Sequence, residues 1–121
     1  MSLAEHLLSG EGPVTLVTTF RLRDGAPVER FIHLWTEVAR LMARRDGFLS
    51  SRLYRAVVGG DSGEYIHVAQ WGHPALLADA RSDPEIRSLE RDLEHLLIDR
   101  RRVLCDAVTE DIQPQRAQPA H

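Results

Sequence analysis

Two segments of this chain alternate as β-strands do, and together they limit the fold more than any other feature. Residues 14–22 (VTLVTTFRL) and 64–71 (EYIHVAQW) are rich in β-branched and aromatic side chains. Successive side chains of a strand point to opposite faces of its sheet, and neither face of either segment is wholly polar. The chain must therefore build a sheet that is covered on both faces.

The rest of the sequence contains helical patterns and two further strand patterns. In residues 27–45 apolar side chains recur at helical spacing, and Gly47 follows as a left-handed cap. The stretch Ser82-Asp83-Pro84-Glu85 is a strong start signal for a later helix. The predicted elements are strands at 14–22, 48–58, 64–71 and 103–110, and helices at 27–45, after Pro74, and from Pro84 to about residue 99.

This order, β-α-β-β-α-β, predicts an α+β protein of ferredoxin-like type with a four-stranded antiparallel sheet. Its helices cover one face of the sheet. The second face, which carries Val17 between Thr15 and Thr19, still needs a protein surface against it. We therefore expect two copies to meet face to face as a homodimeric α+β barrel.

Length and charge narrow the function classes. The 121 residues predict one domain at 13–112, with a flexible lead at 1–12 and a disordered tail at 113–121. A net charge of −3 gives no reason to expect nucleic acid or a membrane as partner. The single cysteine, Cys105, excludes an internal disulfide, and no metal site is expected because no two histidines share ligand spacing on one element. No leader pattern and no membrane-spanning apolar run is found, so a cytoplasmic location is expected.

The strand at 64–71 carries the candidate site. Alternation places Tyr65, His67, Ala69 and Trp71 on one face, a mixture that suits neither a core nor a solvated surface. His67 and Trp71 lie about 13 Å apart along the strand, at roughly 3.3 Å per residue, which brackets a two- or three-ring aromatic ligand. The hypothesis is a ligand cavity between sheet and helices. The proposed apolar walls are Phe31, Trp35, Met42, Leu76 and Leu77, and the proposed hydrogen-bonding contacts are Tyr54 and Tyr65.

Simpler interpretations stand beside that hypothesis. His67 and Trp71 could both be packed core residues. Cys105 is expected to face the core as a small apolar residue. The run Arg100-Arg101-Arg102 is interpreted as the solvated end of the last helix, where positive charge suits the helix dipole.

Three stretches carry a family resemblance: DGFLSSRLYR at 46–55, EYIHVAQWGHPALLADA at 64–80, and SDPE at 82–85. Together they resemble an antibiotic biosynthesis monooxygenase domain of the dimeric α+β barrel superfamily, over about residues 14 to 110. The resemblance implies oxidation of anthrone-like aromatic polyketides to quinones by dioxygen, with no metal, flavin or haem.

The resemblance also implies catalytic positions. A polar residue four before a strand tryptophan, usually asparagine, corresponds to His67 before Trp71. A second asparagine, two before a phenylalanine, corresponds to Thr18 before Phe20. This chain therefore has no asparagine at either position, which differs from the family pattern. Arg91 is a possible match to an arginine that some members use, although its helical position points away from the apolar stripe.

Alternative functions remain open on the same fold. A polyketide cyclase would use His67 as base for aldol ring closure and would need no dioxygen. Haem-degrading relatives place a ligating histidine within the helix after the third strand, where this chain has only His73, at its start. The last alternative is a ligand-binding dimer without enzymatic activity.

Overall fold

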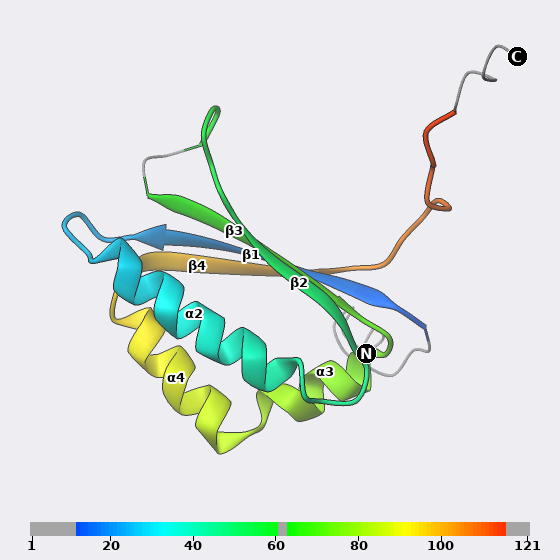
Figure 1. Cartoon of the computed structure of the whole chain (residues 1–121), viewed down its shortest axis with the longest axis horizontal. Coiled ribbons are helices and arrows are strands. Elements are labelled where there is room, and N and C mark those ends of the chain that lie inside the picture. The colour runs from blue at the N-terminus through cyan, green and yellow to red at the C-terminus, as the bar shows by residue number, and fades with distance from the viewer. Residues whose placement is uncertain (1–11, 61–62, 116–121) are drawn as a thin grey trace, which may run out of the picture.

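The structure is a computed structural model that describes residues 12–60 and 63–115. The chain folds into a sheet with helices packed on one of its faces (Figure 1). Its elements in chain order are β1 (Val14–Leu22), α2 (Val28–Met42), β2 (Phe48–Arg55), β3 (Glu64–Trp71), α3 (Pro74–Arg81), α4 (Pro84–Glu94) and β4 (Leu97–Cys105). Of the predicted lead at 1–12 only residue 12 is described, and of the predicted tail at 113–121 only residues 113–115. None of the helices in the described ranges is long and apolar enough to cross a membrane.

The sheet confirms the predicted fold class. Its strand order is β2-β3-β1-β4, and every neighbouring pair is antiparallel. The two central strands, β1 and β3, are the segments with the clearest alternation in sequence. Along β1 every second side chain from Val14 to Leu22 is buried, and the residues between them are partly exposed.

The helix-facing side of the sheet holds two separate apolar clusters. One gathers at the Trp71 end of β3 and consists of Val14, Leu16, Met42, Ala69, Trp71, Leu77, Ala80 and Ile86. The other gathers at the Tyr65 end and consists of Phe20, Leu22, Phe31, Leu34, Tyr65 and Leu93. Aromatic edges hold the second cluster together, since the Phe31 ring lies 5.4 Å from that of Phe20 and 5.1 Å from that of Tyr65.

Helix α2 is shorter than predicted and is turned slightly about its axis. Leu34, expected on the flank, is buried, whereas Ile32, expected in the apolar stripe, is 42% exposed. After the helix, Gly47 adopts the predicted left-handed conformation, with φ of 88°. A β-carbon at Gly47 would meet Leu76 at 2.6 Å, so glycine is also required by the close approach of α3.

The last helix and the last strand differ most from the prediction. Helix α4 begins at the predicted signal, where the Asp83 carboxylate accepts hydrogen bonds from the backbone N–H groups of Glu85 and Ile86. It ends at Glu94 rather than near residue 99, and β4 occupies Leu97–Cys105 rather than 103–110. The helix stops early because the chain turns at His95 and Leu96 to pair with β1. The arginine run is therefore part of a strand, and not the end of a helix.

Within residues 12–60 and 63–115, no helix lies over the outer face of the sheet (Figure 1). It carries the partly exposed residues of β1 together with Val68 and Val103, which pair with Val17 from either side. Cys105 pairs with Thr15 and so lies on this outer face, contrary to the expectation that it faces the core.

Candidate functional site

A row of polar side chains crosses the helix-facing side of the sheet and separates the two apolar clusters. His67 of β3 lies opposite Thr18 of β1, and Thr18 lies opposite Arg102 of β4. Because neighbouring strands lie about 4.8 Å apart, the backbones of His67 and Arg102 are about 10 Å apart. Thr18, in the middle of the row, is only 1% exposed. The flanking rows, Ala69–Leu16–Leu104 and Tyr65–Phe20–Arg100, are mainly apolar.

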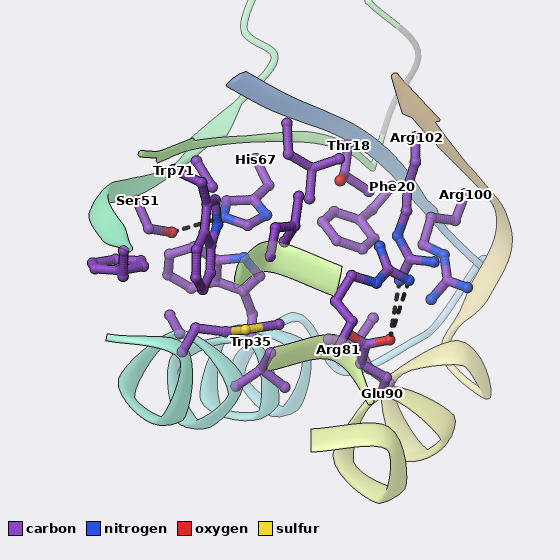
Figure 2. Close-up of a pocket in the computed structure, with 18 residues that line it drawn as sticks. Thr18, Phe20, Trp35, Ser51, His67, Trp71, Arg81, Glu90, Arg100 and Arg102 are labelled. Carbon is purple, nitrogen blue, oxygen red and sulfur yellow. Dashed lines mark hydrogen bonds and ion pairs between the residues drawn. The ribbon is translucent and has the colours of Figure 1, made fainter. Parts of the chain in front are cut away.

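A cavity lies over this row, between the sheet and the helices (Figure 2). Both apolar clusters and the polar row contribute to its walls. The centre of a water molecule can reach about 50 Å³ of it. Since one water needs about 10–15 Å³ on this measure, the space holds a few waters and no fused ring system. Its lining residues are Leu16, Thr18, Phe20, Trp35, Val38, Ala39, Met42, Phe48, Ser51, His67, Ala69, Trp71, Leu77, Arg81, Glu90, Leu93, Arg100 and Arg102.

The imidazole of His67 is held on two sides. Its Nε2 lies 2.7 Å from Ser51 Oγ, in a hydrogen bond to the neighbouring strand β2. Its ring lies 5.2 Å from the Trp35 ring of α2 in an edge-on contact. Burial, together with the positive charge of Arg102, lowers the pKa of His67 from 6.5 to about 4. His67 is therefore neutral at pH 7 and, by itself, a weak base.

Charged side chains occupy the other end of the cavity (Figure 2). Glu90 of α4 accepts a hydrogen bond from Arg102 at 3.1 Å, and its Oε2 lies 3.8 Å from a terminal nitrogen of Arg81. Burial, followed by the charge of Arg81, lowers the pKa of Arg102 to about 10, although Glu90 opposes this shift. The cavity thus has an aromatic end and a cationic end.

A surface groove lies directly beyond the cavity wall. The groove has a volume of about 540 Å³ and shares Leu16, Leu77, Arg81 and Arg102 with the cavity. The Leu77 and Arg81 side chains both come from the short helix α3. These two side chains border both spaces, and the groove itself lies in the range of about 300–1,000 Å³ that ligand sites occupy.

The structure gathers only some of the predicted site residues. Thr18, Trp35, Met42, His67, Trp71 and Leu77 line the cavity together. Four others are not among the lining residues, which corrects their expected position. Phe31 and Tyr65 pack against each other within the second apolar cluster, with their ring centres 5.1 Å apart. Leu76 is 37% exposed beside Gly47, and Tyr54 is 47% exposed on the edge strand β2, along a separate groove that Tyr65 and Trp35 also line.

The sequence prediction missed the charged end of the site. Arg100 and Arg102 were assigned to a helix end, where they would point to solvent. The signal that would have found them is the pattern RRRVLC, in which positions 100, 102 and 104 share one strand face. Arg91, the alternative arginine, is not among the residues that line the cavity. Within the described part of the chain, no group of three or more His, Cys, Asp and Glu residues could hold a metal ion.

Several solved structures share this fold. An antibiotic biosynthesis monooxygenase is 18% identical, with a TM-score of 0.68 over 79% of this chain and 99% of that one. Rv0793 from Mycobacterium tuberculosis is 20% identical, with a TM-score of 0.70 over 81% of this chain and 97% of that one. The chain therefore has the fold of the antibiotic biosynthesis monooxygenases, as the sequence resemblance predicted.

A more specific likeness is to SnoaB from Streptomyces nogalater, a cofactor-independent oxygenase. A mutant of SnoaB is 25% identical to this chain, with a TM-score of 0.73 over 86% of this chain and 99% of that one. No protein-family model and no curated protein sequence matches the chain.

Proposed function

We propose that this protein is a cofactor-independent monooxygenase that oxidises an anthrone-like aromatic polyketide to a quinone with dioxygen. The observation that carries the proposal is the cavity over the row His67–Thr18–Arg102, with aromatic walls at one end and guanidinium groups at the other. The likeness to SnoaB supports a reaction without a cofactor.

The reaction needs little from the protein beyond control of charge and water. Loss of a proton from a CH₂ group between aromatic rings gives a delocalised enolate. The enolate passes one electron to dioxygen, and the resulting radical and superoxide combine as a peroxide at that carbon. Proton return, loss of the second C–H proton and cleavage of the O–O bond leave a carbonyl and water. The protein must accept the first proton and stabilise the enolate in a dry site.

Thr18 and His67 divide these tasks. Thr18 lies between His67 and Arg102 in the polar row, and its hydroxyl donates a hydrogen bond to the enolate oxygen. Neutral His67 is a poor base while only Arg102 faces it. An enolate forming between them raises the pKa of the imidazole, because negative charge favours its protonated form. His67 thus accepts the proton at the moment when charge develops on the substrate, and its bond to Ser51 orients the ring.

The substrate enters through the groove. The cavity of about 50 Å³ is closed to a fused ring, so Leu77 and Arg81 must move for it to bind. The rings then lie between Trp35, Trp71 and Met42. Trp71 is only 1% exposed and is held at its face by Phe48, at a ring distance of 5.5 Å, so it forms a fixed wall.

The proposal includes a second copy of the chain as partner. The outer face of the sheet carries Val17, Val68 and Val103, and none of the helices α2, α3 and α4 lies over it. A copy packed on this face would remove those side chains from water and complete the expected α+β barrel.

Oxygen uptake with anthrone tests the function. Wild-type protein is expected to accelerate uptake over buffer, and His67→Ala to lower kcat about 100-fold, the lower range for loss of a proton-transfer group. His33→Ala is the matched control, because His33 pairs with Glu37 on the exposed face of α2. No acceleration by wild type on several ring systems would refute the oxygenase. Turnover of a polyketide without dioxygen would favour the cyclase.

A further inference from the structure

The cationic end of the cavity contains more positive than negative charge. Arg81, Arg100 and Arg102 all line the cavity, and Glu90 is the carboxylate among its lining residues. Glu90 forms ion pairs with both Arg81 and Arg102. Arg100 is paired with Glu94, which approaches from outside the lining. Among the residues that the structure describes, these three guanidinium groups share two carboxylates, which leaves one positive charge in excess.

These charges are partly withdrawn from water. The side chains of Arg81, Arg100 and Arg102 are 28%, 20% and 27% exposed. Positive charges that are held close together away from water repel one another. The pKa of Arg102 is lowered first by burial and then by the charges of Arg81 and Arg100. An anion bound at this point would relieve that repulsion.

The position of the excess charge indicates which part of a ligand would carry an anionic group. Arg102 stands in the same row as His67, about 10 Å away across two strand spacings. Arg81 lies at the boundary between the cavity and the groove. Figure 2 shows Arg81, Arg100 and Arg102 on one side of the cavity and His67, Trp35 and Trp71 on the other. A ligand with an anionic group at the arginines would therefore have its rings on the side of His67 and the two tryptophans.

We propose that Arg81, Arg100 and Arg102 bind a carboxylate of the ligand, so that the substrate is an aromatic acid. The planar guanidinium fork matches a carboxylate through paired hydrogen bonds. Glu90 competes with that carboxylate for Arg81 and Arg102 while the site is empty. This assignment rests on the proposed function, since it names the substrate class of the same cavity.

Calorimetric titration with 2-naphthoate and 2-naphthamide tests the assignment. The two compounds share their rings and differ in charge, and neither can form an enolate. Wild-type protein is expected to bind the acid about tenfold to a hundredfold more tightly than the amide. Arg102→Gln is expected to remove most of that preference while amide binding persists, which shows that the cavity is still folded.

Two further variants sharpen the test. Arg101→Gln is the matched control, because Arg101 lies on the same strand but on the outer face, opposite Thr19, and it should keep the preference. Glu90→Gln should tighten binding of the acid and leave the amide unchanged. Weaker binding of both compounds to Glu90→Gln would show that Glu90 is only structural and would count against the competition.

The remaining outcomes separate this assignment from the proposed function. Equal binding of acid and amide by wild type overturns the carboxylate site and leaves the aromatic cavity in place. Retention of the preference by Arg102→Gln overturns it as well. Binding of neither compound overturns both proposals. A clear preference for the acid, combined with no oxygen uptake on any anthrone, supports the carboxylate site and overturns the oxygenase.

Discussion

Lowering the pH from 7.5 to 5 is expected to destabilise the folded chain by about 2 kcal/mol through His67. Burial, and then the charge of Arg102, lowers the pKa of this imidazole from 6.5 to about 4 in the folded chain. The unfolded chain keeps the ordinary value and so binds the proton more strongly. The stabilising contribution is present in full above pH 6.5 and is lost as the pH falls toward 4.

The size of the effect follows from the two pKa values. Each pH unit between them changes the free energy of unfolding by about 1.4 kcal/mol, because the unfolded state binds one more proton than the folded state. The span from 6.5 to 5 accounts for the figure of about 2 kcal/mol, and a further unit brings the loss to about 3 kcal/mol. Stopping at pH 5 keeps most carboxylates ionised, so their titration adds little.

Urea unfolding at both pH values, followed by tryptophan fluorescence, measures the effect. His67→Gln is the comparison, because glutamine can keep a hydrogen bond to Ser51 and does not titrate. The pH-dependent loss should be about 2 kcal/mol smaller in the variant than in wild type. An NMR titration of the His67 ring gives the pKa directly.

Two results would refute the reasoning. One is a midpoint near 6.5 for the His67 ring in the folded protein, which would mean that the site is wetter than the structure shows. The other is the same pH dependence of stability in wild type and His67→Gln.

Two further predictions concern the fold. Gly47→Ala is expected to lower the free energy of unfolding by about 1–3 kcal/mol, because Gly47 has φ of 88° and a β-carbon there would meet Leu76. Gly25 is the control, because it also has positive φ but a β-carbon there would meet nothing within 4 Å. Gly25→Ala should therefore lose less stability in the same urea assay. Asp83→Ala is expected to lose about 1 kcal/mol with the N-cap of α4. Asp83→Asn should recover most of that loss, and equal losses in both variants would show that the cap is unimportant.

The alternation of apolar and polar residues predicted β1 and β3 correctly, because every second side chain of β1 is buried and β3 pairs beside it at the centre of the sheet. The bounds of β1 and β3 agree with the prediction, and so does the start of α4 at Asp83 and Pro84. Strong local signals and tertiary structure favour the same conformation at these positions.

The last strand was misplaced because its residues do not favour a strand locally. Arginine is a good helix former, and residues 97–102 continue the charged pattern of α4. Pairing with β1 overrides that preference. The error hid half of the candidate site, since the cationic end depends on which face of β4 carries Arg100 and Arg102. His67 and Trp71 were found because alternation alone placed them together.

The polar row His67–Thr18–Arg102 lies between the two apolar clusters. The residues that stabilise the fold are therefore largely separate from the residues proposed to bind the ligand. Each apolar cluster closes around its own aromatic residues, with Trp71 in one and Phe31 in the other. Positions 18, 67 and 102 belong to neither cluster, although His67 contacts Trp35 at the edge of the second one. Evolution or protein engineering can therefore change the chemistry of the site at one row of residues across three strands, while most of the fold stays the same.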